Sequence, residues 1–309
     1  MRLIDQHNRR IRKLRLSLTD KCNLRCHYCM PIDQTFMEEN NYLSPYEIKE
    51  IVSELVSYGL EELRLTGGEP LLRRNFSDIA LSLGTLPIKL GLTTNGIFLD
   101  KYFNVLKKAN ILNLNISLDS LNEDNFKKIT FGNHFHRVIE NTLEAKRLGF
   151  KVKINTVAMK GINDHEVEDF INFSEENSIE VRFLELMRIG HACADQTKQF
   201  ISADELMKKM NRHLTPEKVA LDSTSFNFTT EHGGKVGFIA SESKPFCGQC
   251  SRWRLSADGI MRACLLKDDG LSIKDKSADD RLLAYQTLLG MKPALRPLEV
   301  SHQMNQIGG

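Results

Sequence analysis

The chain has 309 residues, of which 42 are lysine or arginine and 40 are aspartate or glutamate. Hydrophobic residues make up 41% and charged residues 27%, a composition that is typical of globular proteins and excludes disordered and fibrous classes. The balanced charge argues against a protein that coats nucleic acid, and no apolar run is long enough for a membrane span. Residues 1–15 are basic and polar, so we expect no secretory signal and a cytoplasmic location.

Short segments with alternating apolar residues predict six strands, at residues 11–19, 62–66, 89–93, 112–118, 152–158 and 181–186. Apolar residues at helical spacing lie between these strands. Ser44, Pro45 and Glu47 predict the capped start of a helix that ends at Gly59. Further helices are predicted at residues 135–148, at residues 164–177 and after a second capping box formed by Ser202 and Glu205.

Strands that alternate with helices predict an α/β fold with a parallel sheet and crossover helices. Six such units are too few for a closed eight-unit barrel, so we expect an incomplete, open (β/α)6 barrel. In these folds, functional residues gather at the carboxyl ends of the strands. A serine- and threonine-rich segment at residues 222–230 marks a change in composition. We therefore expect a barrel core at residues 1–220 and a smaller C-terminal region at residues 221–309.

The seven cysteines fall into two sets of three, with Cys193 apart from both. An odd number of cysteines in a chain without an export signal favours metal binding over disulfides. The first set, Cys22, Cys26 and Cys29, follows the first predicted strand. A [4Fe–4S] cluster takes four thiolates, so three leave one iron open, as a catalytic metal site requires. A structural zinc site is the alternative, although paired CxxC units are its usual spacing.

The second set, Cys247, Cys250 and Cys264, repeats this three-thiolate pattern and predicts a second cluster. Cys193 is a candidate fourth ligand, but its polar surroundings favour a solvent-facing thiol. Between the cysteines of the second set lie Arg252 and Arg254, whose side chains point the same way if the segment is extended. Two adjacent guanidinium groups suit a phosphate chain, and solvated surface arginines are the alternative.

CxxxCxxC after the first strand, followed by Gly67-Gly68-Glu69-Pro70 after the second, resembles the radical S-adenosylmethionine (SAM) superfamily. The resemblance implies a [4Fe–4S] cluster whose open iron binds the methionine part of SAM, and whose electron cleaves SAM to a 5′-deoxyadenosyl radical. It also implies the residues that bind SAM: Tyr28 against the adenine, Gly68 beside the methionine amine, and Ser117 and Met187 along the rest of the molecule.

Within this superfamily the chain resembles, over nearly its whole length, the GTP-cyclising family of molybdenum cofactor biosynthesis. The shared segments are residues 14–20, 65–70, 92–96, 246–254 and 307–309. The resemblance implies that the second [4Fe–4S] cluster binds guanine, and that GTP is contacted by Arg15, Arg64, Thr93, Lys153, Arg252, Trp253 and Arg254. It implies a catalytic role for Arg252, Arg254, Gly308 and Gly309, since a two-glycine tail fits a narrow cavity.

The implied product is 3′,8-cyclo-7,8-dihydro-GTP, which a separate cyclic pyranopterin monophosphate synthase consumes. The implied partners also include an electron donor such as flavodoxin or ferredoxin, and a second copy of the chain in a homodimer. Two features depart from the family pattern: Trp253 replaces a smaller aliphatic residue, and Phe226-Asn227-Phe228 replaces a strand with arginine and tyrosine. Two alternatives stay open, a radical SAM enzyme that modifies peptides and a non-catalytic protein with two zinc sites.

Overall fold

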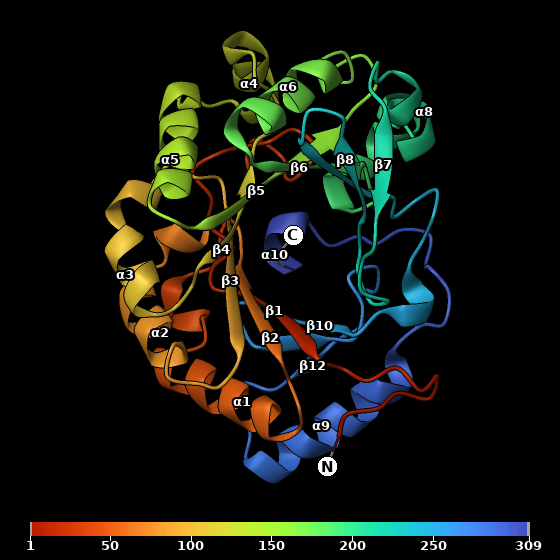
Figure 1. Cartoon of the computed structure of the whole chain (residues 1–309). Coiled ribbons are helices and arrows are strands. Elements are labelled where there is room, and N and C mark those ends of the chain that lie inside the picture. Colours follow the sequence, from red (N-terminus) through yellow and green to blue (C-terminus); the bar gives the residue numbers. More distant parts are fainter. Residues whose placement is uncertain (1, 308–309) are drawn as a thin grey trace.

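A computed structural model describes residues 2–307 of the chain. Its strands form one curved sheet in the order β12-β11-β10-β1-β2-β3-β4-β5-β6-β9-β8-β7 (Figure 1). The strands are β1 (Lys13–Ser17), β2 (Glu62–Thr66), β3 (Lys89–Thr94), β4 (Asn113–Ser117), β5 (Lys151–Ala158), β6 (Glu180–Glu185), β7 (Leu214–Glu217), β8 (Phe226–Thr230), β9 (Lys235–Ile239), β10 (Arg252–Leu255), β11 (Ile260–Arg262) and β12 (Leu271–Ser272). The helices are α1 (Pro45–Ser57), α2 (Phe76–Leu83), α3 (Phe103–Lys108), α4 (Glu123–Thr130), α5 (Phe135–Arg147), α6 (Val167–Asn177), α7 (Gln196–Gln199), α8 (Ala203–Lys208), α9 (Ala278–Met291) and α10 (Met304–Ile307).

The six predicted strands are confirmed as β1 to β6, each within two residues of its expected bounds. They pair in parallel and in chain order, with helices between them on the outside of the curve (Figure 1). Within residues 2–307 the sheet does not close on itself, because its order runs from β12 to β7 without a ladder between the two ends. The prediction of an incomplete parallel barrel is therefore confirmed.

The C-terminal part of the chain extends the barrel at both edges. β10 pairs in parallel with β1, and β9 pairs in parallel with β6. The hairpin of β7 and β8 straddles the division that we expected at residue 220, so the two parts of the chain share one sheet. The division itself stays a prediction about how the chain is organised.

Alternation along the strands separates an apolar outside from a polar inside. Leu14 and Leu16 of β1 and Leu63 and Leu65 of β2 are buried in the hydrophobic core, beneath the surrounding helices. The residues between them on the same strands, such as Arg15, face the inside of the barrel and line a cavity. The inside of this barrel is thus a polar chamber.

Local capping explains where two of the predicted helices begin. Ser44 and Glu47 form the predicted capping box at the start of α1, and Ser202 and Glu205 form the one at α8. The backbone N–H groups at a helix start lack partners within the helix, and the cap side chains supply them. α6 begins three residues later than predicted, because Asp164 accepts a hydrogen bond from the N–H of Gly161 in a preceding turn.

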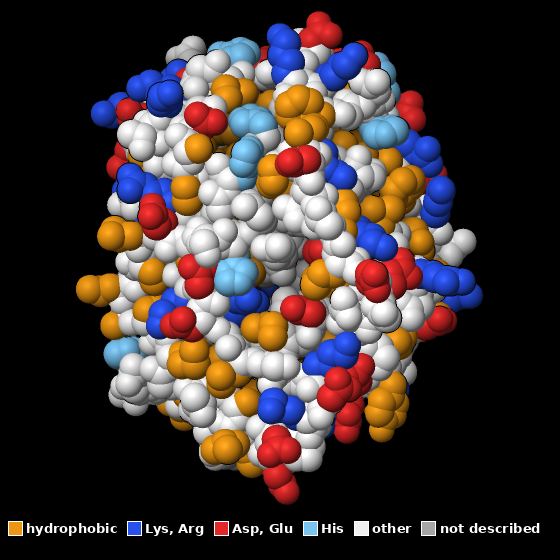
Figure 2. Space-filling view, turned by 180° about the vertical axis from the view of Figure 1, so that it is seen from behind, with side chains coloured by type: hydrophobic (Ala, Val, Ile, Leu, Met, Phe, Trp, Pro, Cys, Tyr) orange, Lys and Arg blue, Asp and Glu red, His pale blue; other side chains and the backbone are white. Residues whose placement is uncertain are grey.

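The surface carries both signs of charge without a large patch of either on the face that Figure 2 shows. Lysine and arginine side chains there alternate with aspartate and glutamate, as the balanced composition predicts. In the described part of the chain, no helix combines the length and the apolar character that crossing a membrane requires.

Candidate active site

A cavity of about 660 Å³ fills the inside of the barrel. Its lining includes side chains from all six core strands and from β10, and five of the six clustered cysteines: Cys22, Cys26, Cys247, Cys250 and Cys264. Because β10 runs parallel to β1, Cys250 before β10 and Cys22 after β1 lie at opposite ends of these strands. The cavity therefore joins the two cysteine sets, with the strand residues between them.

The first cysteine set lies in the loop that follows β1. Burial raises the pKa of Cys22 to about 11, and burial together with the neighbouring Cys22 and Asp119 raises that of Cys29 to about 12. Burial, Asp119 and the other two thiols also raise the pKa of Cys26. Iron is bound by thiolates, and these three thiols do not ionise easily in the protein alone. They fit a site for a cationic iron–sulfur cluster, whose binding would drive the loss of all three thiol protons. Within residues 2–307, no three His, Cys, Asp or Glu side chains are grouped closely enough to hold a single metal ion.

The Gly67-Gly68 turn after β2 packs directly on the backbone of this loop. A carbon added to Gly68 would lie 2.4 Å from the carbonyl oxygen of Lys21, so no side chain fits there. Glu69 is buried and accepts hydrogen bonds from the N–H groups of Leu71 (3.0 Å) and Asn95 (2.7 Å). Asn95 in turn donates to the sulfur of Cys22 (3.9 Å). The turn after β2 therefore packs against the backbone of the cysteine loop and, through Glu69 and Asn95, also positions the thiol of Cys22.

Tyr28 is held in one orientation by a buried carboxylate. Its hydroxyl donates to Asp119 (2.7 Å), which also accepts from the N–H of Val157 (2.8 Å). Burial raises the pKa of Asp119 to about 6 and raises that of Tyr28 well above its usual value. Tyr28 lines the cavity together with the other three residues that the sequence predicted for SAM: Gly68, Ser117 and Met187. The structure thus brings the four predicted SAM residues to one end of one cavity.

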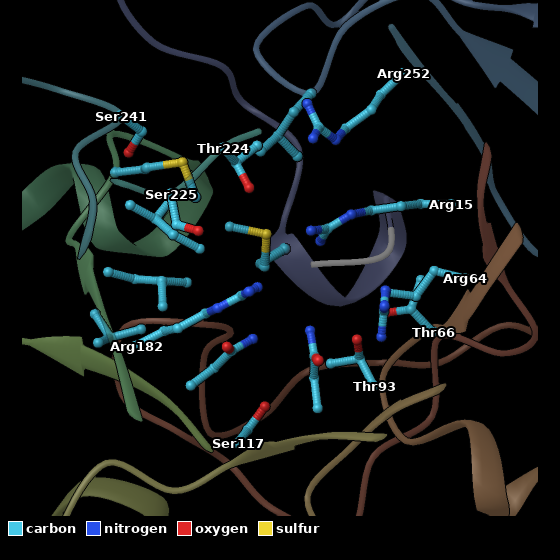
Figure 3. Close-up of a pocket in the computed structure, with 18 of the residues that line it drawn as sticks. Arg15, Arg64, Thr66, Thr93, Ser117, Arg182, Thr224, Ser225, Ser241 and Arg252 are labelled. Atoms are coloured by element: carbon cyan, nitrogen blue, oxygen red, sulfur yellow. The ribbon is translucent and has the colours of Figure 1, made fainter. Parts of the chain in front are cut away.

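Arginines from neighbouring strands converge in the middle of the cavity. Arg15 of β1 is in register with Arg64 of β2 and Arg254 of β10. Figure 3 shows Arg15, Arg64 and Arg252 pointing into the same space, with Arg182 opposite them. Burial lowers the pKa of Arg15 well below its usual value, and the charges of Arg254, Arg64 and Arg252 lower it further. Such a concentration of positive charge in a cleft attracts and orients a polyanion.

Several polar atoms in this chamber are buried without a partner. They include Oγ1 of Thr93, Oδ1 of Asn155, Nη1 of Arg252 and Oδ1 of Asn305, and all four of these residues line the cavity. Buried polar groups are nearly always hydrogen-bonded in folded proteins, because leaving one unpaired costs free energy. Unpaired atoms that face one cavity are therefore the expected lining of a ligand site.

Space for one of the arginines is provided by a glycine on the next strand. A carbon added to Gly91 of β3 would lie 2.9 Å from the guanidinium of Arg64. Lys153 of β5, the other predicted basic contact, pairs with Glu180 (2.6 Å) and also lines the cavity. Arg64, Thr93 and Lys153 thus reach the chamber from β2, β3 and β5.

The loop between β7 and β8 connects the two edges of the open barrel. Asp222 in this loop forms ion pairs with Arg12 (2.8 Å) and Lys13 (2.9 Å) and accepts a hydrogen bond from Ser251 (2.7 Å), all through one carboxylate oxygen. Its carbonyl oxygen also accepts from Nη2 of Arg252 (2.8 Å). These contacts attach the β7–β8 side of the sheet to β1 and β10, and Thr224 and Ser225 of the loop face the cavity (Figure 3).

We expect Asp222→Asn to destabilise the fold in a pH-dependent way. Burial alone would raise the pKa of Asp222, but the hydrogen bonds from Ser251 and Lys13 and the charges of Lys13 and Arg12 lower it to about 2. A depressed pKa means that the stabilisation is present above about pH 4 and is lost as the pH falls towards 2. The substitution is expected to cost about 1–2 kcal/mol at pH 7, discounted for the partly exposed partners.

Urea unfolding at a series of pH values measures this difference directly. The gap between wild type and Asp222→Asn is expected to shrink as the pH falls below 4. Asp33→Asn, at an exposed position, serves as the matched control and is expected to change stability by less than about 0.5 kcal/mol. If the difference in unfolding free energy between the two proteins stayed constant across this pH range, the stabilisation would not come from the ionised carboxylate of Asp222.

The second cysteine set lies at the amino end of β10. Burial, followed by the neighbouring thiols, raises the pKa of Cys247. At Cys250 the effect of burial is outweighed by the charges of Lys292 and Arg252, which lower the pKa. The sulfur of Cys264 accepts a hydrogen bond from the N–H of Leu266 (3.4 Å). Three thiols that influence one another, one of them in a cationic setting, fit the donor set of a second cluster.

The end of the chain returns to the mouth of the barrel. α10 lies over the centre of the curved sheet in Figure 1. Asn305 donates to the carbonyl oxygen of Asp20 (3.0 Å) beside the first cysteine set, and the carbonyl oxygen of Ile307 accepts from Nη1 of Arg254 (3.3 Å). Residues up to Ile307 thus reach the space between the cysteine sets, whereas Gly308 and Gly309 lie outside the described residues.

The structure does not bring all the predicted residues together. Trp253 is only 1% exposed and does not line the cavity, because it alternates with Arg252 and Arg254 and packs on Tyr285 of α9 (ring centroids 6.1 Å apart). The expectation that it contacts GTP is corrected accordingly. Cys193 lies near the carbonyl oxygen of Val300 (4.0 Å) and is not among the residues that line the cavity.

Phe226-Asn227-Phe228 does form a strand, β8, but its aromatic side chains serve the fold. The rings of Phe226 and Phe228 pack on that of Phe238, with centroids 5.5 Å and 6.0 Å apart. Neither phenylalanine lines the cavity. Ser223, Thr224 and Ser225, just before β8, do line the cavity. The cavity wall next to β8 therefore carries polar groups even though β8 lacks the arginine and tyrosine of the family pattern.

Sequence reasoning missed several residues that line the chamber. Arg182 of β6 is in register with Asn155 of β5, and both side chains face the inside. The alternation of Val181 and Phe183 towards the core was the signal that placed Arg182 on the inner face. Arg296 also lines the cavity, but it comes from an irregular segment for which the sequence offers no such periodicity.

Comparisons with known proteins agree with this geometry. Residues 16–174 match the model of the radical SAM superfamily, and residues 179–289 match the model described as Molybdenum Cofactor Synthesis C. A GTP 3′,8-cyclase from Synechocystis sp. is 57% identical over 99% of this chain and 95% of its own. Another from Aquifex aeolicus is 40% identical over 88% of each chain.

A solved structure of Streptococcus suis SuiB bound to S-adenosylmethionine is similar in fold. It aligns with a TM-score of 0.61 over 93% of this chain and 69% of its own. The sequence identity is 14%, so this likeness shows the shared partial-barrel fold alone.

Proposed function

The chain belongs to the GTP 3′,8-cyclase family of radical SAM enzymes, and we propose that its barrel cavity is where GTP becomes 3′,8-cyclo-7,8-dihydro-GTP, the first step of molybdenum cofactor biosynthesis. The observation that carries this proposal is the single cavity that joins both cysteine sets, with arginines between them. A reaction that must hold a nucleotide against a radical source needs such an arrangement, because both reactants have to be fixed in one enclosed space.

Membership of the radical SAM superfamily implies a [4Fe–4S] cluster and SAM. Cys22, Cys26 and Cys29 would hold this cluster, and Tyr28, Gly68, Ser117 and Met187 would bind SAM beside it. When bound, the cluster and SAM supply the one-electron cleavage that starts hydrogen abstraction. The protein fixes the loop through Glu69 and Asn95, and it orients Tyr28 through Asp119.

GTP would occupy the middle of the chamber. Arg15, Arg64 and Arg252 provide charge-assisted donors for phosphate oxygens, and Nη1 of Arg252 is buried there without another partner. Arg254 lies next to Arg15 in the register of the sheet. Lys153 and the unpaired hydroxyl of Thr93 would complete the predicted contacts. These groups orient the substrate and balance its charge, which is the electrostatic part of the catalysis.

The second cysteine set would hold a further [4Fe–4S] cluster at the opposite end of the chamber. Three thiols leave one iron open, and the guanine base would lie at that position when the phosphates are held by the arginines. Arg252 and Arg254 lie on β10, directly after Cys250, and both line the cavity. They would therefore lie beside a GTP molecule whose guanine base is at the second cluster, and would act on it directly. Gly308 and Gly309 would act there too, because Ile307 already contacts Arg254.

The partners and the location follow as further parts of the proposal. The product would pass to a cyclic pyranopterin monophosphate synthase, which is the partner that the chemistry requires next. A low-potential donor such as flavodoxin or ferredoxin would supply the electron, the enzyme would work in the cytoplasm, and a homodimer is the proposed assembly.

Mass spectrometry of 5′-deoxyadenosine tests the proposed function. The anaerobically reconstituted, reduced protein is incubated with SAM, with and without GTP, and the amounts of 5′-deoxyadenosine and of GTP and its product are followed. Release that increases with GTP, together with conversion of GTP to the cyclised product, is the expected result. Release that ignores GTP would overturn the substrate, and would favour a peptide-modifying enzyme. No release from protein loaded with iron and sulfide would overturn the enzyme assignment.

A further inference from the structure

Lys292 is a buried lysine behind the second cysteine set, and the proposed reaction gives it no task. It follows α9 and is 2% exposed. Its ammonium donates to the sulfur of Cys250 (3.5 Å), to the carbonyl oxygen of Arg252 (2.8 Å) and to that of Ala263 (2.9 Å). An ammonium has three donors, so these contacts use all of them. Each acceptor belongs to a cysteine of the second set or lies within two residues of one.

The charge of Lys292 has no carboxylate to balance it among the described residues. Burying an ammonium without a negative partner is costly, because the charge loses its hydration. Arg9 provides the contrast: it is also buried and donates to the carbonyl oxygen of Cys247 (2.7 Å), but Asp5 pairs with its guanidinium (2.6 Å). The negative charge that would balance Lys292 is therefore expected at the neighbouring thiols, in their ionised form.

We propose that Lys292 is a positioning residue for the second cluster, whose negative charge it balances and whose reduction it favours through the hydrogen bond to Cys250. This inference rests on the proposed function only in requiring that a cluster is bound at this set. The same side chain ties the start of β10 to Ala263, directly before Cys264, so it also fixes the distance between two of the three thiols.

The physical basis is the effect of charge and hydrogen bonding on an iron–sulfur cluster. Reduction adds one electron, so the reduced cluster is the more negative form and gains more from a nearby positive charge. A hydrogen bond to a ligand sulfur acts in the same direction, because it stabilises electron density on that sulfur. Lys292 supplies both at Cys250, and its burial leaves the charge unscreened by water.

Redox titration of the second cluster tests this role. Wild-type protein, Lys292→Met and Lys292→Gln are reconstituted as full chains, and the reduced state of each cluster is followed by electron paramagnetic resonance with a chemical reductant. Lys292→Met is expected to weaken reduction of the second cluster about tenfold, which corresponds to about 59 mV for one electron. Lys292→Gln is neutral but keeps donor hydrogens, and its shift is expected to be smaller.

Two controls separate the effect from a general loss of structure. The cluster on Cys22, Cys26 and Cys29 reports on the same molecule and is expected to keep its potential. Lys276→Met removes an exposed lysine just before α9 and is expected to leave both clusters unchanged. An unchanged second cluster in fully loaded Lys292→Met would overturn the proposal, whereas selective loss of that cluster from a folded chain would support it.

A measurement on the unmutated chain covers the case in which the neutral variants do not fold. Protein labelled with 15N-lysine is expected to show a weak nitrogen coupling in the pulsed magnetic resonance spectrum of the reduced second cluster, and the absence of this coupling would overturn the proposal. Iron and sulfide analysis of wild-type protein comes first: one cluster per chain would refute the second cluster of the proposed function, independently of Lys292.

Discussion

Cys26→Ala is expected to abolish the release of 5′-deoxyadenosine, whereas Cys250→Ala is expected to preserve that release and abolish the cyclisation of GTP. The two thiols line the same cavity but belong to sets at opposite ends of it. Losing an outer partner of a metal ligand costs about 10–100-fold in activity or affinity, so losing a ligand itself should cost at least about a thousandfold. The two losses should fall on different steps.

Anaerobic assays of both products in parallel measure this separation. In Cys250→Ala, the response of 5′-deoxyadenosine release to GTP is expected to weaken, because one wall of the nucleotide site is lost while the SAM end stays intact. Cys193→Ala is the matched control, since this thiol is not among the residues that line the cavity. If both cysteine variants lose 5′-deoxyadenosine release equally while retaining iron at the other set, the assignment of separate roles to the two ends is wrong.

The fold could be predicted well from local patterns along the chain. Alternation of leucines with polar residues in β1 and β2 marks both the strand and its buried face, so the six core strands were predictable within two residues. α2, α3, α4 and α9 were not predicted: α2 and α3 are short and no side chain caps their first turns, whereas α4 and α9 were missed although Asn122 and Ser277 cap them. The pairing of β10 with β1 brings together residues far apart in the chain, which no local pattern specifies.

The site was predictable where a strand or a cysteine spacing defined it. Arg15, Arg64 and Lys153 are on inner strand positions, and all of them line the cavity. Trp253 was misplaced because its neighbours suggested a role that the alternation of β10 excludes: a residue between two inward arginines must face outward. Asp222 and Lys292 act through contacts between distant segments, and the sequence carried no signal for either.

Arg15→Met is expected to stabilise the substrate-free protein and to weaken GTP binding. Arg15 lies between Arg64 and Arg254 in the register of the sheet, and its lowered pKa reflects burial and the repulsion from these neighbours. Methionine keeps an unbranched apolar stem and removes the guanidinium charge, so the repulsion is relieved when no anion is bound. We expect a gain of about 1–2 kcal/mol, a typical benefit of relaxing a site that is built for function.

The same substitution removes a charge-assisted contact to the phosphates. Such contacts contribute about 1.5–3 kcal/mol, which corresponds to roughly a tenfold to hundredfold weaker affinity for GTP. Thermal unfolding without ligand measures the change in stability, and calorimetric titration with GTP measures the change in affinity.

Two controls accompany these measurements. Guanosine, which has no phosphate, should bind equally to both proteins, and Arg147→Met at an exposed position of α5 should change neither stability nor GTP affinity. An Arg15→Met protein that is less stable and binds GTP normally would show that the arginines serve the barrel rather than the substrate.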